Sequence, residues 1–420
     1  MAVEVCSTAF VSLGHAQAKA LGYAELPIVA VPHPFGGLSR DKTREAAEKC
    51  VAGIVLAALE KMPDSSKVLA STDFSAEAIE VSADPDEINR LNRDRLWSDG
   101  LPVVPATAER VQRMLSCTPR KRNEVVAMLA PAFGAATVEL IAINAVMAGC
   151  DPEYLPVLSA ATEAIADSSF TLQGIQTTTN PAAAWLIVNG PVARRLGMNS
   201  GINCLGQGNW ANATLGRALR LIMQNIGGAL SGDMDRATIG QPGKYLFCCA
   251  ENEQENPWEP LHVEKGYRPE QSTVTVVGAE GTLNLNTHSK NADEILRIFA
   301  QTLARPSGND YFLCGQPWII LCPEHAAVMK KAGLSKLDVK RRFWAGSQLP
   351  VRYMTDIDRN LTQVRRRSEL GEFTSDTTLP ICSAPESLGI VVCGSAGTHS
   401  VYVPSFGNTR SVTREIVWSA

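Results

Sequence analysis

Residues 1–37, MAVEVCSTAFVSLGHAQAKALGYAELPIVAVPHPFGG, decide the fold class that we expect for this chain. Within them, residues 2–6 (AVEVC) are β-branched, residues 13–22 (LGHAQAKALG) are alanine-rich and end in glycine, and residues 26–37 open with a second apolar run. Residues 41–62 then show helical periodicity, with Asp41 placed to cap the helix. This strand–helix–strand–helix order predicts an α/β fold with mostly parallel sheets and right-handed crossovers.

Two residues of this opening stand where predicted strands end. Cys6 ends the first strand, with Ser7 beside it, and His33 follows the second strand. In parallel α/β sheets, ligands bind beyond the carboxyl ends of the strands. We therefore expect Cys6, Ser7 and His33 to lie at a site.

The composition excludes several classes of partner. Of the 420 residues, 39 are Lys or Arg and 43 are Asp or Glu, a net charge of −4, so we expect no nucleic acid or membrane partner. The apolar stretches are too short or too interrupted to span a bilayer, and no charged segment precedes an apolar one at the start. Eleven cysteines are scattered without a C-x-x-C pair, which argues against a disulfide framework and favours the cytoplasm.

Composition shifts along the chain predict four parts. Residues 1–82 form an N-terminal α/β unit, and residues 83–106, polar and then rich in Pro and Gly, form a linker. Residues 107–285 form a middle α+β domain, and residues 286–420 return to α/β alternation as a C-terminal domain flanked by helices.

Residues 392–400 (VCGSAGTHS) carry the sharpest chemical signal. Cys393 follows an apolar strand, and Gly394 and Gly397 let the backbone bend closely around a ligand. The amide groups of such a loop bind anions and lower the pKa of a thiol, with His399 as its proton partner. The hydroxyl groups for substrate binding are those of Ser395, Thr398 and Ser400. The alternative interpretation is a tight connection that carries an inert core cysteine.

Residues 203–217 (NCLGQGNWANATLGR) place glycines just before a predicted helix. The pattern resembles a phosphate-binding loop, but no convincing strand precedes it and no acidic residue follows at the required distance. We retain the weaker hypothesis that Asn209, Asn212 and Arg217 line a binding site for substrate. The alternative is a glycine-rich entry into a helix.

Residues 250–267 (AENEQENPWEPLHVEKGY) gather carboxylates around one histidine. Glu251 and His262 are candidate metal ligands, since carboxylate and imidazole groups bind divalent cations. No H-x-x-x-H pair supports a metal site, so a rigid loop with ordinary surface charge is the stronger interpretation. No motif requires a cofactor.

Several stretches resemble a known family. Val3-Glu4-Val5-Cys6-Ser7-Thr8 and Pro32-His33-Pro34-Phe35-Gly36 resemble segments of the UGSC family of thiol and selenol proteins, and also of the selenoprotein subunit of glycine reductase component B. The stretches that resemble longer UGSC-like proteins are DGLPVVPAT, INAVMAGCDPEYLPV, ANATLGRALRLI, NPWEPLHVEKGY and VCGSAGTHS.

This resemblance implies a redox loop, Sec/Cys-Gly-Ser-Cys, after a strand that would precede residue 1. A separate small subunit supplies that segment, or the chain functions without it, or a selenocysteine codon was read as a stop. On this basis Met1 marks the second strand of the unit, and Cys6 lines the site instead of acting as the nucleophile.

Together these observations predict an enzyme that uses thiolate chemistry on a small polar substrate containing carboxylate or nitrogen, in a reductive or lyase reaction. Its site lies between the N- and C-terminal regions, with Cys393 as nucleophile. One alternative is a non-catalytic or half-site subunit, completed by a small partner chain in a homo- or hetero-oligomer. The other is a metal-dependent hydrolase.

Overall fold

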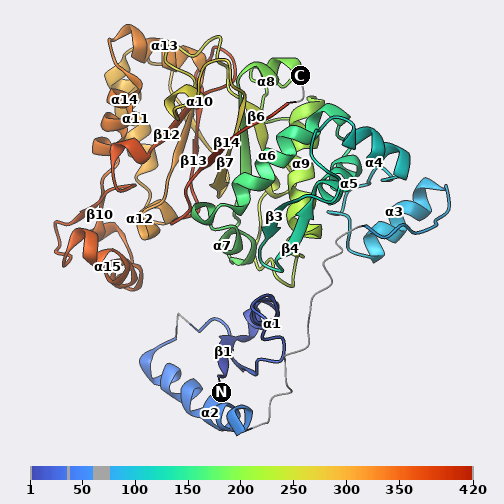
Figure 1. Cartoon of the computed structure of the whole chain (residues 1–420). Helices are drawn as coiled ribbons and strands as arrows, with labels where there is room; N and C mark the ends of the chain where they lie inside the picture. Colours follow the sequence, from blue (N-terminus) through green and yellow to red (C-terminus); the bar gives the residue numbers. More distant parts are fainter. Residues whose placement is uncertain (1, 36–37, 60–75, 419–420) are drawn as a thin grey trace.

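The computed structural model describes residues 2–35, 38–59 and 76–418. The N-terminal unit follows the expected order (Figure 1), with β1 (Glu4–Ser7), η1 (Thr8–Phe10), α1 (Val11–Ala20), β2 (Ile28–Val31) and α2 (Arg40–Leu59). β1 and β2 pair in parallel, with Cys6 opposite Ala30. Asp41 lies in the first turn of α2 rather than at its cap, and the Ser39 hydroxyl accepts a hydrogen bond from the Lys42 amide at 3.5 Å.

The remaining described residues form a larger body. Its first part contains α3 (Pro85–Asp94), α4 (Ala108–Leu115), β3 (Val125–Leu129), β4 (Gly134–Thr137), α5 (Val138–Ala148), η2 (Pro152–Tyr154), α6 (Leu155–Ala166), η3 (Ser168–Phe170), α7 (Leu172–Thr177), β5 (Ala183–Asn189), α8 (Pro191–Arg195), α9 (Trp210–Asn225), η4 (Pro242–Lys244), β6 (Cys248–Ala250), α10 (Leu261–Glu264) and β7 (Thr273–Ala279). Its second part contains β8 (Leu283–Asn286), α11 (Ala292–Leu303), α12 (Asn309–Leu313), β9 (Trp318–Leu321), α13 (Pro323–Lys331), α14 (Lys336–Gly346), β10 (Leu349–Pro350), η5 (Val351–Tyr353), α15 (Asp356–Leu370), β11 (Thr378–Leu379), η6 (Pro385–Ser387), β12 (Gly389–Val392), β13 (His399–Val403) and β14 (Val412–Glu415).

Two mixed four-stranded sheets form the centre of this body. The first core sheet has the order β6-β5-β7-β14, and the second core sheet has the order β12-β9-β13-β8. In each sheet the first pair is parallel and the next two pairs are antiparallel. The α/β class is therefore confirmed, but the core sheets are mixed instead of mostly parallel.

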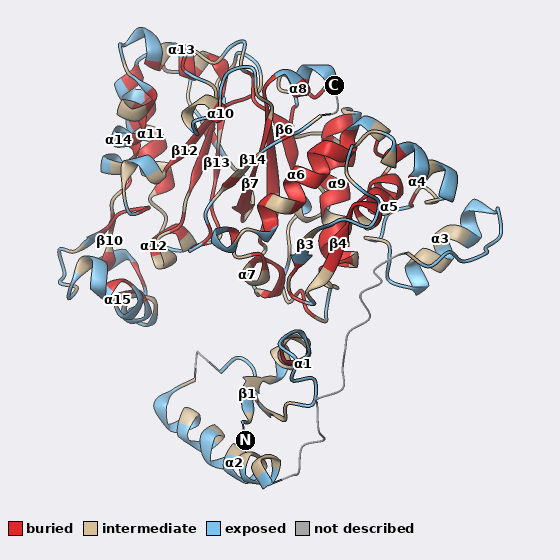
Figure 2. Ribbon diagram, viewed as in Figure 1, coloured by how far each residue is buried: buried red, intermediate tan, exposed pale blue. Residues whose placement is uncertain are grey.

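Alternating side chains show that the two core sheets pack face to face. In β5, Leu186 and Val188 join the apolar core beneath α5, α6 and α9, whereas Trp185 and Ile187 face the other way. In β9, Ile319 and Leu321 join the core beneath α11, α13 and α14, whereas Trp318 and Ile320 share a third core with Trp185 and Ile187. Because strand side chains alternate between faces, the body has helix, sheet, sheet and helix layers (Figures 1 and 2).

The two core sheets repeat one arrangement. Trp185 of β5 lies opposite Val277 of β7, and Trp318 of β9 lies opposite Val403 of β13. The two indole rings meet edge to face at the centre of the interface, 5.9 Å apart. The chain crosses between the sheets twice: β7 of the first sheet is followed by β8 of the second, and β13 of the second is followed by β14 of the first. Each crossing leads into an edge strand, β8 or β14.

These crossings change the predicted domain organisation. The stretch beyond residue 286 does not stand alone, since β14 completes the first core sheet. The predicted linker contains α3, capped by the Asp84 side chain. It is also fastened to α9, because Gln224 donates hydrogen bonds to the carbonyl groups of Leu96 and Ser98 at 3.1 and 3.0 Å. None of the helices in the described ranges is both long enough and apolar enough to cross a bilayer.

Candidate thiol site

Three buried cysteines meet where the core sheets face each other. Cys249 lies in β6 of the first sheet, Cys393 directly follows β12 of the second, and Cys204 lies in the loop before α9. The sulfur atoms of Cys249 and Cys393 are 4.0 Å apart, and the Cys393 thiol also donates to the carbonyl of Ala250 at 3.5 Å. We call Cys204, Cys249 and Cys393 the thiol cluster.

Strand alternation explains why these thiols face one another. Cys248 points into the core under α9, whereas its neighbour Cys249 points toward the second sheet. In β12, Ile390 and Val392 face the outer helices, so Val391 and Cys393 face the first sheet. β6 pairs in parallel with β5 and β12 with β9; Cys393 directly follows the carboxyl end of β12, and Cys249 is the middle residue of the three in β6.

Hydrogen bonds hold the Cys204 loop against both sheets. The buried Asn212 side chain donates to the carbonyl groups of Asn199 and Cys204, at 2.8 and 2.9 Å, and accepts from the Asn199 amide at 3.0 Å. The Ser200 carbonyl accepts from the amide of Gly394 at 2.8 Å. Gly394 has φ +87°, a left-handed conformation that favours glycine, as its place in the predicted tight loop requires.

The three thiols of the cluster differ in pKa. Interaction with the thiols of Cys249 and, second, of Cys393 lowers the pKa of Cys204 well below its ordinary value despite burial. Interaction with Cys204 and burial raise the pKa values of Cys249 and Cys393 well above the ordinary value. Cys204 is thus the one thiol of the cluster whose pKa is lowered, and 7% of its surface is exposed against 2% for Cys393.

A cavity of about 180 Å³ is lined in part by residues that neighbour the thiol cluster in the chain or bond to its loops, and the three cysteines themselves are not in its lining. Its lining includes Ser200, Ala250 and Asn252, and each of these residues bonds to the cluster or its loop. Asn252 donates to the Gly394 carbonyl at 3.0 Å. The charged side chains in the lining are those of Arg194, Glu251 and Glu253.

Glu251 anchors a polar network beside this cavity. Its carboxylate accepts hydrogen bonds from the Asn189 and Asn256 side chains and the Leu261 amide, at 2.5, 2.7 and 2.7 Å. Burial raises its pKa, and nearby Lys336 opposes that rise. His262 lies 3.6 Å from Glu253 and is almost wholly buried. In the described part of the chain, no group of three or more His, Cys, Asp or Glu side chains could hold a metal ion.

The structure separates Cys393 from its predicted proton partner. His399 begins β13, is exposed, and has one side-chain hydrogen bond, from Nδ1 to the Asn284 side-chain oxygen at 3.1 Å. The buried Ser400 bonds instead with His325 Nδ1 at 2.8 Å and accepts from the Cys322 amide. Ser395 is exposed, and its hydroxyl reaches only the Ala396 carbonyl. Thr398 accepts from the Thr287 amide through its carbonyl.

The residues predicted to bind substrate near α9 have internal partners. Asn209 caps α9 by accepting from the Asn212 amide. Arg217 makes a two-point contact with Asp99, with both N···O distances 2.9 Å, and also donates to two backbone carbonyls. These contacts make Asn212 and Arg217 structural residues, and Asn212 acts on the site through Cys204.

The N-terminal unit brings together two of its predicted residues. The Ser7 hydroxyl lies 3.1 Å from His33 Nδ1, beyond the paired ends of β1 and β2. Burial, with a smaller effect of Glu4, raises the pKa of Cys6. Between described residues, no side-chain hydrogen bond or ion pair joins residues 2–59 to residues 76–418. A site shared between these parts therefore stays a prediction.

Residues 1–60 match the UGSC family. The N-terminal segment of this chain is UGSC-like. The resemblance expected from its Cys-Ser and Pro-His-Pro segments is thereby confirmed over this UGSC segment. No curated protein and no solved structure matches the chain.

Sequence reasoning missed two members of the thiol cluster. Cys204 lies within the glycine-rich stretch 203–217, and Cys249 is the second member of the adjacent pair Cys248–Cys249. The adjacent pair did contain a usable signal, because neighbouring residues of a strand face opposite sides. Because Cys248 points into the core under α9, Cys249 points to the opposite face of β6.

Proposed function

We propose that this chain is a thiol-dependent oxidoreductase in which Cys204 supplies the attacking thiolate. The observation that carries the proposal is the thiol cluster, in which Cys204, Cys249 and Cys393 share one buried core and the pKa of Cys204 is lowered. A thiolate is the nucleophilic form of cysteine, and neighbouring donors favour it. Cys393, the nucleophile expected from the sequence, takes the role of a donor and second thiol.

The proposed reaction uses two of the three thiols. The Cys204 thiolate attacks the electrophilic atom of a substrate A–B, and B leaves with the bonding electron pair and takes a proton. The thiol of Cys249 or Cys393 then attacks the Cys204 sulfur, which forms a disulfide and releases A with its electron pair and the proton of that thiol. The substrate gains two electrons and two protons, and a dithiol reductant restores the enzyme.

The cavity supports a small polar substrate. Arg194 fits a carboxylate group, whereas Glu251, Glu253 and Asn252 fit amine or amide nitrogen. A volume of about 180 Å³ is below the usual range for drug-sized ligands, so the substrate is a molecule of few atoms.

Mild oxidation tests this proposal without knowledge of the substrate. We expect diamide to form an intramolecular disulfide between Cys204 and Cys249 or Cys393, located by mass spectrometry of peptides. Cys204→Ser should slow this oxidation at least tenfold, whereas Cys248→Ser, a buried neighbour on the opposite face, should leave it unchanged. A folded Cys204→Ser protein that oxidises at the original rate within the cluster would contradict the proposal.

A second candidate function is a half-site subunit completed by a partner chain. The observation that favours it is the small core of the UGSC segment, where Ala18 and Val31 are the buried apolar residues among those described. α2 exposes a set of apolar side chains, namely Val51, Val55, Leu56 and Leu59. A two-stranded sheet is marginal by itself, and a strand added to β1 would enlarge its core.

Hydrogen exchange distinguishes this candidate from the first. The β1 and β2 amides should exchange quickly in the recombinant chain and become protected in native material that contains a small second chain. Equal and strong protection in both samples would contradict the half-site role.

A further inference from the structure

A second cavity, of about 520 Å³, lies far from the thiol cluster. The cavity is lined by Arg220 and Gln224 of α9, by residues of the stretch 231–245 that follows it, and by Asp99 from the segment between α3 and α4. Arg220 and Lys244 also line a small space beside Ala182–Ala184, next to the start of β5, whereas the thiols lie near its other end. The seven residues of β5 span roughly 20 Å.

Arg220 is a nearly buried cation with few partners. Its side chain is 14% exposed, and its one hydrogen bond among the described residues goes to the Ala229 carbonyl at 2.9 Å. The nearest carboxylate, Asp235, lies 3.6 Å away. A guanidinium group has five N–H donors, so most of the donors of Arg220 have no protein acceptor. A buried charge is costly unless it is paired.

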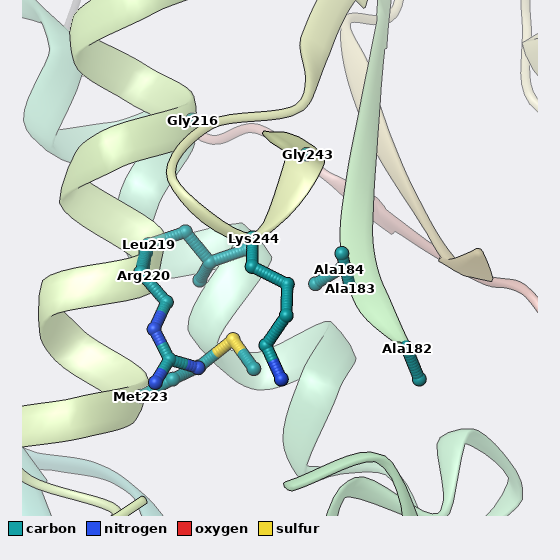
Figure 3. A pocket seen from close by; sticks show the side chains of 9 residues that line it. All are labelled: Ala182, Ala183, Ala184, Gly216, Leu219, Arg220, Met223, Gly243 and Lys244. Atoms are coloured by element: carbon teal, nitrogen blue, oxygen red, sulfur yellow. The ribbon is translucent and has the colours of Figure 1, made fainter. Parts of the chain in front are cut away.

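Two cations of the cavity face one carboxylate. The two carboxylate oxygens of Asp235 lie 2.8 and 2.7 Å from Lys244 Nζ. The same carboxylate is the one nearest to Arg220, so it faces two cations. The other carboxylate of the lining, Asp99, is bound by Arg217. Figure 3 shows the charged ends of Arg220 and Lys244 on the same side of the small space that they share. The lining holds two cations and two carboxylates, and with Asp99 paired to Arg217, Asp235 is the lining carboxylate left to face both Arg220 and Lys244.

The lining also offers apolar surface and a free donor. Ile239 is 94% exposed and Tyr245 is 50% exposed, so both offer apolar surface at the edge of the cavity. The Nε2 atom of Gln241 is buried and has no hydrogen-bond partner in the described structure. An anion with an apolar body would satisfy the donors and cover these side chains at once.

We propose that this cavity binds a small organic carboxylate, held by Arg220 with Lys244 beside it, while Ile239 and Tyr245 cover its apolar part. Arg220 forms a paired contact with the carboxylate oxygens, the geometry that a guanidinium group favours. This site is separate from the thiol cluster and does not depend on its chemistry.

Calorimetric titration of the full chain with benzoate tests the proposal, with benzamide as a neutral ligand of the same shape and inorganic phosphate as an anion without an apolar part. We expect benzoate to bind at least tenfold more tightly than benzamide or phosphate. Equal binding of benzoate and benzamide, or no benzoate binding at millimolar concentration, would overturn the proposal.

Variants locate the binding. Arg220→Gln should weaken benzoate at least tenfold, and Tyr245→Ala, a change at an exposed side chain, should weaken it several-fold without loss of folding. Arg113→Gln, on α4 and outside the cavity, is the matched control and should bind as the original chain does. Unchanged benzoate affinity in both Arg220→Gln and Tyr245→Ala would overturn the assignment to this cavity.

Discussion

Cys249 and Cys393 come from different core sheets, yet their sulfur atoms lie 4.0 Å apart. A disulfide needs sulfur atoms about 2.05 Å apart, so the two thiols are reduced but close. Interaction with both lowers the pKa of Cys204. The interface between the sheets thus brings together three thiols from distant parts of the chain.

Asn212 should control the acidity of Cys204 through the position of its loop. Asn212→Ala removes three hydrogen bonds to Asn199 and Cys204, so we expect unfolding to become easier by about 2 kcal/mol. The Cys204 pKa should rise toward its ordinary value, because the sulfur loses its fixed place beside its donors. Thiol alkylation against pH measures the pKa, and chemical denaturation measures the stability. An unchanged Cys204 pKa would contradict the positioning role.

Arg217 should contribute to stability and leave thiol chemistry unchanged. Its two-point contact with the buried Asp99 is broken in Arg217→Gln, which leaves a carboxylate without its charge partner. Loss of one partner of a buried pair costs roughly 3–5 kcal/mol. Denaturant unfolding should show that loss, while the rate of diamide oxidation in the folded variant stays the same. A variant of full stability and slower oxidation would restore the substrate-binding role predicted from the sequence.

Some parts of this fold follow from the sequence and others do not. The apolar runs and the helical periodicity predict β1, α1, β2 and α2. They also predict strand β12 of the second core sheet and the tight loop that begins with Cys393 and Gly394. Strand direction was not predictable, because β8 and β14 exchange between sheets and only tertiary contacts decide that exchange. The thiol cluster was missed for the same reason, since its members become neighbours only when the sheets pack.

The two tryptophans at the centre of the sheet interface should carry comparable energies. Trp185 and Trp318 are fully buried and occupy equivalent places in the two sheets. Trp185→Ala and Trp318→Ala should each destabilise the chain by about 3–5 kcal/mol. Trp210→Ala, at a side chain 62% exposed, should change stability by less than about 0.5 kcal/mol. Denaturant midpoints compare the three variants, and a small cost for either buried tryptophan would argue against the face-to-face packing.

Asp310 should make stability depend on pH. Burial raises the pKa of its carboxyl group to about 7, although Ser405 and Tyr402 donate hydrogen bonds to it. Because the folded state holds this proton to higher pH than the unfolded chain does, its contribution is complete below about pH 4 and is lost as pH rises to about 7. The loss amounts to roughly 4 kcal/mol at most.

Asp310→Asn should remove most of that fall, since the amide does not ionise. Free energies of unfolding measured between about pH 4 and pH 7 check this expectation. Asp376→Asn, at an exposed carboxylate, is the control and should keep the slope of the original chain. Parallel slopes for Asp310→Asn and the original chain would show that Asp310 does not titrate in this range.

A stabilised thiolate at Cys204 is the basis of the proposed function. The most direct measurement is the rate of iodoacetamide alkylation at Cys204 as a function of pH, followed by mass spectrometry of the peptide that contains it. An ordinary thiol titrates near about 8.5. We predict that Cys204 has already reached its maximal rate at about pH 6, because Cys249 and Cys393 lower its pKa. A rate that is negligible at about pH 6 and rises with a midpoint near 8.5 would contradict the account.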